Sequence, residues 1–339
     1  MSDKPILDQQ TQQRILRYTV GVTLAVFLAA WINWPLAFVA PVFTAKFLID
    51  KPNLHKETVY ELLLAVVVTM GLGLLLSRGI THYPIPLLIL VGLMMLWGYY
   101  LFVDPKWNLF ATILLIAVLM LPFMAIDNPG VSVMLASGLA TSGVVSVMIF
   151  ALVHVFFPEP KSEFSGFAAA PLEKKQRWYA AFRAMIISYP VVCFFFIFQI
   201  SEALLTMMFI ALLSLMITSE KSIKLSAFLV ISNGIGGLLA IAAFSILSIV
   251  PNIIFYSLFI GLVAIVIAKK IYTVPEKAPI FATAFSTLLV LVGSTLMSSG
   301  DIDSNTLIRI FQLVLIGIYM ILASLFLETR NWKFLQNQP

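Results

Sequence analysis

The fold class of this chain is decided by the stretch NLFATILLIAVLMLPFMAI, residues 108 to 126. It carries no charge, and about 20 apolar residues in a helix cross the roughly 30 Å of hydrocarbon in a bilayer. Similar runs recur along the 339 residues, which are 61% hydrophobic and 11% charged, with a mean hydropathy of +1.01. A soluble domain of this length carries far more surface charge. The sequence therefore predicts an all-α polytopic membrane protein.

Twelve apolar segments can be marked along the chain. In the first half they are roughly 15–33, 35–50, 58–77, 84–103, 108–126 and 130–157, and in the second roughly 178–199, 202–218, 223–248, 252–268, 278–298 and 305–327. We predict about 12 transmembrane helices. Whether the short segment 35–50 crosses the bilayer fully stays open.

The positions of the cations predict an orientation. If the N-terminus is cytoplasmic and every segment crosses once, only Arg78 and Arg309 of the 21 lysines and arginines lie outside. Cytoplasmic loops of membrane proteins carry such an excess of lysine and arginine. We therefore expect both termini in the cytoplasm. The basic pI of about 9.2 then reflects this asymmetry and predicts no nucleic-acid partner.

The second segment lies in NWPLAFVAPVFTAKFLIDKP, residues 33 to 52, and contains two unusual residues. Pro41 is predicted to interrupt the segment near its middle, where freed carbonyls would line a cavity. Lys46 lies about one turn from the cytoplasmic end, so its ammonium group can reach water or pair with Asp50. The proline is therefore the more informative of the two.

The two halves of the chain resemble each other. Thr69-Met-Gly-Leu-Gly73 matches Ser232-Asn-Gly-Ile-Gly236, and Phe110-Ala-Thr112 matches Phe281-Ala-Thr283, while Arg17 and Arg183 begin equivalent segments. An even number of spans in each half makes these parallel repeats. We expect a first six-helix membrane repeat over 1–157, a cytoplasmic linker over 158–177 and a second six-helix repeat over 178–339.

Catalytic patterns are absent from the sequence. Its three histidines stand far apart, its one cysteine, Cys193, lies in an apolar run, and no HExxH, P-loop or GxSxG pattern occurs. We therefore expect no enzyme activity, no catalytic residue, no cofactor and no metal site.

Transport needs polar groups and irregular helices inside the membrane. Pro122 and Pro190 resemble Pro41 in falling within apolar segments, although a packing kink explains most such prolines. Glu61 and Glu202 lie near membrane interfaces, which favours interfacial residues over proton carriers, and Arg78 and Arg309 are either anchors or attract anions. The candidates for a substrate or ion pathway are Pro41, Lys46, Glu61, Arg78, Glu202, Asn233 and Arg309.

The stretches RILRYTVGVTLAVFLAAWINWPLAFVAPVFTAKFLIDKP (14–52) and, more loosely, RWYAAFRAMIISYPVVCFFF (177–196) resemble the fusaric acid resistance and aromatic acid exporter (FUSC-like) family. The larger members carry cytoplasmic domains after each membrane half, whereas this chain offers only a 20-residue linker and a short tail. The resemblance implies efflux of small aromatic or weak organic acids across the bacterial inner membrane, often beside a periplasmic adaptor (membrane fusion) protein. It assigns no residue a role.

The leading hypothesis is a multi-pass efflux transporter driven by the proton motive force, with a small organic anion as its substrate and the lipid bilayer around it. A passive anion channel and a non-transporting subunit of a larger efflux assembly stay open as alternatives, as does a homo-oligomer. The lack of a carboxylate in the middle of a segment favours the channel.

Overall fold

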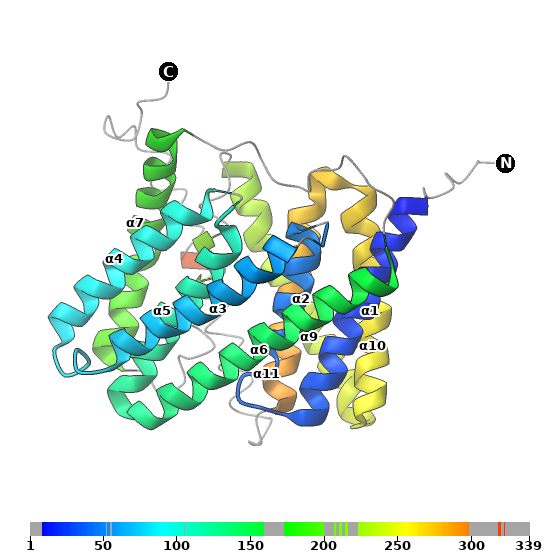
Figure 1. Ribbon diagram of the computed structural model, residues 1–339, viewed down its shortest axis with the longest axis horizontal. Helices are drawn as coiled ribbons and strands as arrows, with labels where there is room; N and C mark the ends of the chain where they lie inside the picture. Colours follow the sequence, from blue (N-terminus) through cyan, green and yellow to red (C-terminus); the bar gives the residue numbers. More distant parts are fainter. Residues whose placement is uncertain are drawn as a thin grey trace. The chain divides into compact units, whose positions relative to one another are not determined.

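In the computed structural model, the chain forms α-helices joined by short turns (Figure 1). The structure describes residues 9–51, 53–54, 56–104, 106–158, 173–199 and 223–297, together with positions 207, 210, 211, 214, 215, 318, 319 and 322. Within these residues every regular element is a helix, and seven helices are long and apolar enough to cross a membrane. The protein is therefore an all-α, multi-pass membrane protein.

The helices in the described part of the chain follow the predicted apolar segments. They are α1 (Gln9–Ile32), α2 (Val39–Asp50), α3 (Lys56–Ser77), α4 (Pro84–Phe102), α5 (Asn108–Asp127), α6 (Pro129–Phe156), α7 (Lys174–Phe198), α9 (Ile223–Ile249), α10 (Ile253–Thr273), the short 3-10 helix η1 (Pro275–Lys277) and α11 (Ala278–Met297). The predicted segments 202–218 and 305–327 lie outside the described residues, apart from single positions.

Polar and special residues set several helix ends. Asn252 precedes α10, and its side-chain oxygen accepts hydrogen bonds from the backbone N–H groups of Ile254 (2.8 Å) and Phe255 (3.4 Å). Such a cap satisfies donors that have no partner within the helix. At their C-terminal ends, α1 and α7 are each followed by a residue with positive φ, Asn33 (51°) and Gln199 (46°).

Helix α2 differs from its prediction. It begins at Val39, so Pro41 lies in its first turn, where the missing N–H removes no intrahelical hydrogen bond. The expectation that Pro41 interrupts this segment near its middle is therefore wrong. With 12 residues, α2 is about 18 Å long at 1.5 Å per residue, which is too short to cross about 30 Å of hydrocarbon.

The other two prolines lie where the sequence places them. Pro122 is inside α5 and Pro190 is inside α7, and both helices continue past them. They are interior prolines of continuous helices rather than helix breaks.

The chain divides into two compact units. Unit 1 comprises Met1–Leu63, Thr141–Ala168 and Ile235–Ser299, and unit 2 comprises Leu64–Ala140, Ala169–Gly234 and Gly300–Pro339. Three of the boundaries fall within α3, α6 and α9. Each unit therefore contains helices from both halves of the sequence.

Unit 1 is built around α1. This helix packs most extensively on α10 and also on α2, and α11 packs on both α10 and α2 (Figure 1). Gly21 of α1 approaches Leu48 of α2, while Gly261 of α10 approaches Thr23 of α1. Helix α2 is enclosed, with nearly every side chain buried.

In unit 2, α4 packs on α7 and on α5, and α5 is the helix that is buried along most of its length. Tyr99 of α4 shares a hydrogen bond of 2.7 Å with Ser188 of α7, and the Tyr189 hydroxyl donates to the carbonyl oxygen of Leu88 at 2.9 Å. These contacts fix α4 against α7 through polar groups within an apolar interface.

Candidate functional site: a pocket in unit 1

The residues that the sequence singles out are not gathered at one place. Pro41 and Lys46 share α2, and Arg78 is exposed just after α3 in unit 2. Glu61 and Asn233 lie on the backbones of α3 and α9, but their side chains are outside what the structure describes. Glu202 and Arg309 also lie outside the described residues.

The predicted pair at the end of α2 is present. Lys46 Nζ lies 2.9 Å from Asp50 Oδ2, and both side chains are about one quarter exposed. The pair keeps both charges at the rim of unit 1. It explains the lysine without a role in a transport pathway.

Helix α6 contributes a row of hydroxyl groups that the sequence reading did not single out. Ser142 Oγ donates to the carbonyl oxygen of Leu36 at 3.0 Å and accepts from Trp34 Nε1 at 2.8 Å. One turn later, Ser146 Oγ lies 2.6 Å from the carbonyl oxygen of Ser142 and 2.9 Å from that of Ala40, so its one proton is shared between the two. The carbonyls of Leu36 and Ala40, on either side of the start of α2, are therefore in hydrogen-bond contact with α6.

Thr44 is unusual as a result. Six threonines on the described helices donate to the carbonyl four residues earlier, among them Thr112 to Asn108 and Thr283 to Pro279. The carbonyl four residues before Thr44 belongs to Ala40, which already accepts from Ser146. The Thr44 hydroxyl is fully buried and has no hydrogen-bond partner among the described residues.

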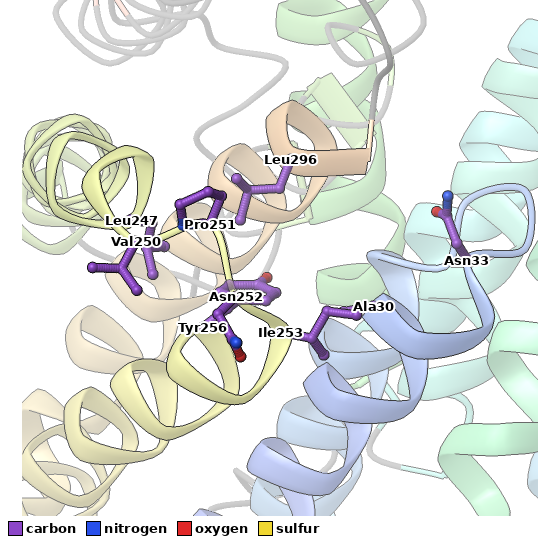
Figure 2. Close-up of a pocket in the computed structure, with 9 residues that line it drawn as sticks. All are labelled: Ala30, Asn33, Leu247, Val250, Pro251, Asn252, Ile253, Tyr256 and Leu296. Atoms are coloured by element: carbon purple, nitrogen blue, oxygen red, sulfur yellow. The ribbon is translucent and has the colours of Figure 1, made fainter.

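A pocket of about 220 Å³ lies at one end of unit 1 (Figure 2). Its walls come from the C-terminal ends of α1, α9 and α11 and from the turn that begins α10. The lining residues are Ala30, Asn33, Leu247, Val250, Pro251, Asn252, Ile253, Tyr256 and Leu296.

The pocket has a buried floor and an exposed rim. Leu247 and Tyr256 are 2% and 6% exposed, whereas Asn33, Val250 and Ile253 are exposed. Figure 2 shows Ala30 of α1 on the side facing Ile253 of α10. This mixture of apolar walls with a few polar groups is typical of small-molecule sites.

The sequence carried only a partial signal for this pocket. Pro251-Asn252 between two apolar runs marks a turn and a helix cap, and Tyr256 follows one turn later on the same face. Ala30 gives no signal, because it is one small residue in an apolar helix. A pocket formed by four chain segments is visible only once they pack together.

The opposite end of unit 1 is closed by aromatic rings. Tyr18 is fully buried, and its ring lies 6.4 Å from that of Tyr272 and 6.0 Å from that of Phe285. The Tyr272 hydroxyl donates to the carbonyl oxygen of Leu48 at 3.3 Å. This cluster joins α1, α2, α10 and α11 at the end away from the pocket.

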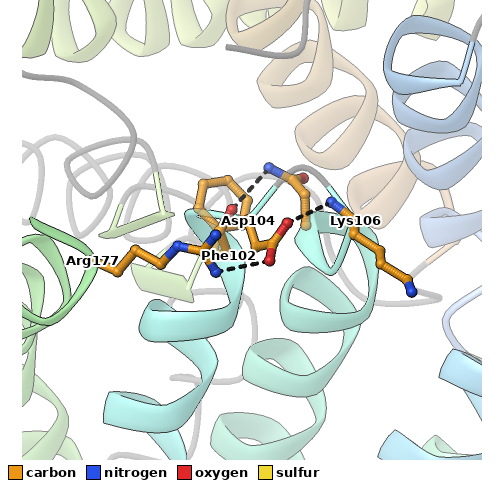
Figure 3. Close-up of polar contacts among 5 residues, drawn as sticks. Phe102, Asp104, Lys106 and Arg177 are labelled. Atoms are coloured by element: carbon orange, nitrogen blue, oxygen red, sulfur yellow. Dashed lines mark hydrogen bonds and ion pairs between the residues drawn. The ribbon is translucent and has the colours of Figure 1, made fainter. Parts of the chain in front are cut away.

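Unit 2 has an ion pair at one helix end (Figure 3). Arg177 Nη1 lies 2.8 Å from Asp104 Oδ2, while the backbone N–H of Lys106 donates to Asp104 Oδ1 at 3.1 Å. Asn108 Nδ2 donates to the carbonyl oxygen of Phe102 at 3.3 Å. The turn between α4 and α5 is thereby tied to the first turn of α7.

Among the described residues, no group of three or more His, Cys, Asp or Glu side chains is placed to hold a metal ion. Cys193 is a free thiol on α7. The pocket of unit 1 is therefore the strongest candidate site in the part of the chain that the structure covers.

The chain is similar to one known family over part of its length. Residues 14–153, less than half of the sequence, match a family described as "Protein of unknown function (DUF2955)". No curated protein and no solved structure matches the chain.

Proposed function

We propose that this protein exports small aromatic or other weak organic acids, or related amphipathic compounds, across the bacterial inner membrane, with the proton motive force as its energy source. The observation that carries the proposal is the pocket of unit 1, which offers a small ligand apolar walls and a few polar groups within a bundle of membrane-spanning helices. Sites of this kind lie between the helices of bundles.

The charge distribution within each unit supports a cytoplasmic side for the end away from the pocket. In unit 1 that end carries Arg14, Arg17, Lys46, Lys51, Lys269, Lys270 and Lys277. In unit 2 the end with the Asp104–Arg177 pair also carries Lys106, Lys174 and Lys175. Under the positive-inside rule these ends face the cytoplasm, and the pocket then opens toward the outer side.

We further propose that about twelve spans form two parallel six-helix repeats. When α1 and α7 are aligned at their last residues, Ile32 and Phe198, the positive-φ residues Asn33 and Gln199 fall at the same position. The matching Phe-Ala-Thr triplets lie in α5 and α11. Their threonines, Thr112 and Thr283, each donate a hydrogen bond to the carbonyl four residues earlier.

Glycine contacts support the same alignment. A Cβ atom on Gly73 of α3 would meet Leu121 and Ala117 of α5, and one on Gly236 of α9 would meet Ala284 of α11, while Gly71 and Gly234 have open space. The matched glycines thus behave alike in both halves.

A second pair of glycines occupies matching positions in the two halves. The ninth residues of α4 and α10 are Gly92 and Gly261. Gly92 approaches Tyr189 of α7, and Gly261 approaches Thr23 of α1. Tyr189 and Thr23 are equivalent when α7 and α1 are aligned at their ends. Under this alignment, α4 packs on α7 through the same position by which α10 packs on α1.

The transport proposal is tested with the purified full chain in proteoliposomes. Uphill movement of benzoate that collapses when a protonophore is added supports a coupled exporter. Downhill benzoate current that the protonophore does not affect supports the passive anion channel instead. A protein that moves neither benzoate nor benzyl alcohol contradicts transport by the chain alone and leaves the reading as a subunit of an efflux assembly, where a periplasmic adaptor or a second copy is required.

A further inference from the structure

Size sets the first limit on what the pocket of unit 1 holds. Its volume is about 220 Å³, and an apolar cavity of about 150 Å³ in another protein binds benzene. One six-membered ring with one small substituent therefore fits within this pocket.

The polar groups of the pocket set the second limit. Among the described residues that line it, none carries a formal charge, and the polar side chains are those of Asn33, Asn252 and Tyr256. The oxygen of Asn252 already accepts two backbone N–H groups, so its NH₂ group is what it offers a ligand. The Tyr256 hydroxyl, whose oxygen lies beside Gly293 of α11, both donates and accepts.

These groups suit a hydroxyl substituent and not a carboxylate. A hydroxyl finds a donor and an acceptor in the pocket, whereas a carboxylate finds donors but no cation among the described lining residues. On the buried floor beside Leu247 and Tyr256 a charge without a cation loses its water at a cost, so an acid held there binds with its proton retained.

The space for a ring exists in unit 1 because Ala30 is small. The position equivalent to Ala30 on α7 is Phe196, which is 4% exposed and packs edge-on against Phe123 of α5 at 5.4 Å. The position equivalent to Phe123 on α11 is Ser294. A buried aromatic pair thus stands in unit 2 where unit 1 has an alanine and a serine.

We infer that the pocket of unit 1 binds small uncharged amphipathic molecules that carry one ring and a hydroxyl group, with Ala30 providing the room for the ring and Tyr256 the hydrogen bond. This inference rests on the proposed transport function and narrows its substrate class to the uncharged amphipathic compounds named there, because it selects phenol-like or benzyl-alcohol-like molecules over organic anions at this site.

The test is binding of fluorobenzyl alcohol and fluorobenzoate to the detergent-purified full chain at neutral pH, followed by fluorine NMR, with empty micelles subtracted. We expect saturable binding of the alcohol, with a dissociation constant at least about tenfold lower than that of the benzoate, a gap of about 1.4 kcal/mol. Ala30→Phe should weaken alcohol binding about tenfold or more. Tyr256→Phe should weaken it by a few-fold, as the loss of one hydrogen bond requires.

Ile32→Phe is the matched control, since it enlarges an exposed residue of α1 at the same end of the helix and should leave binding unchanged. Thermal unfolding establishes that each variant is folded, and Ala30→Leu replaces Ala30→Phe if the latter does not fold. Benzoate binding as tight as alcohol binding, or alcohol binding unaffected in a folded Ala30 variant, overturns the inference. Benzoate export with no alcohol site overturns this inference alone, whereas alcohol binding without any flux overturns only the proposed function.

Discussion

At the scale of single residues, the serines of α6 have the clearest role. Ser142 is fully buried and holds both the Trp34 indole and the Leu36 carbonyl, in a segment where Leu36 has a positive φ of 59°. In a bilayer no water replaces such partners, so each polar group must be satisfied within the protein. Two hydroxyls one turn apart thereby hold the irregular approach to α2.

We predict that Ser142→Ala destabilises the protein by about 1–3 kcal/mol, because the part-buried Trp34 Nε1 loses its acceptor and the carbonyl of buried Leu36 loses its donor. Ser146→Ala should cost less, since the Thr44 hydroxyl, four residues beyond Ala40, can then donate to the carbonyl that Ser146 releases. The measurement is thermal unfolding of the purified variants in one detergent.

Ser245→Ala on the exposed face of α9 is the control for these serines, because its hydroxyl bonds only within its own helix at the surface and its loss should leave the midpoint unchanged. Equal effects of Ser142→Ala and Ser146→Ala would contradict the assigned role of Thr44.

At the scale of helices, small residues decide how closely pairs approach. Gly236 of α9 stands against the backbone of Ala284 in α11, while Gly234, two residues earlier, has no atom within 4 Å of where its Cβ would lie. Close contact through glycine is a common way for membrane helices to associate. The two glycines of one sequence motif therefore have different structural roles.

Gly236→Ala should destabilise the protein by about 1–3 kcal/mol, because a backbone carbonyl cannot move aside as a side chain does. Gly234→Ala should be neutral or slightly stabilising, since alanine favours the helix over glycine. Unfolding of the two variants under identical conditions checks the difference. If Gly234→Ala costs as much as Gly236→Ala, the packing of α9 on α11 described above is wrong.

The positions of the helices were the most predictable feature of this structure, and their irregular ends were the least predictable. The long apolar runs place α5 and α6 within a residue or two of their observed ends, because hydrocarbon thickness and the absence of charge dictate a helix there. The start of α2 was missed because a proline in the first turn looks the same in sequence as one in a helix interior. The partners that decide between these cases, Ser142 and Ser146, lie about a hundred residues away.

The candidate site was less predictable still. Charges and prolines draw attention in an apolar sequence, yet Lys46 is explained by its pair with Asp50. The pocket is lined instead by residues such as Ala30 and Tyr256, whose meaning in the sequence depends on the residues that surround them in space. Under the proposed alignment of α1 with α7, Ala30 falls where the other half has Phe196, a difference that the sequence alone does not single out.

At the scale of the whole molecule, the proposed orientation in the membrane rests on the cation-rich end of each unit. Single cysteines in a Cys193→Ser background test it with a membrane-impermeant maleimide applied to intact cells. Arg78→Cys and Asn252→Cys should react from outside, and Lys106→Cys and Lys270→Cys only after the cells are opened. All four positions are exposed in the structure.

In each unit, one of these positions lies at the cation-rich end and one at the opposite end. Labelling of Lys270→Cys in intact cells would place the basic end of unit 1 outside and would reverse the side on which the pocket opens. Labelling of Lys106→Cys but not of Lys270→Cys in intact cells would place the basic ends of the two units on opposite sides of the membrane. That result would contradict the proposed parallel repeat.

Unit 1 can complete its packing only late in synthesis, because it combines helices from both halves of the chain. The bond from Tyr272 to the Leu48 carbonyl joins residues 224 positions apart, which a ribosome working at about 5–20 residues per second covers in roughly 10 to 45 s. For that interval α1 and α2 are already made while α10 and α11, their main neighbours, are not. The first hairpin therefore resides in the bilayer with its inward surfaces covered by lipid or by the insertion machinery, and those surfaces must exchange that cover for protein before unit 1 closes.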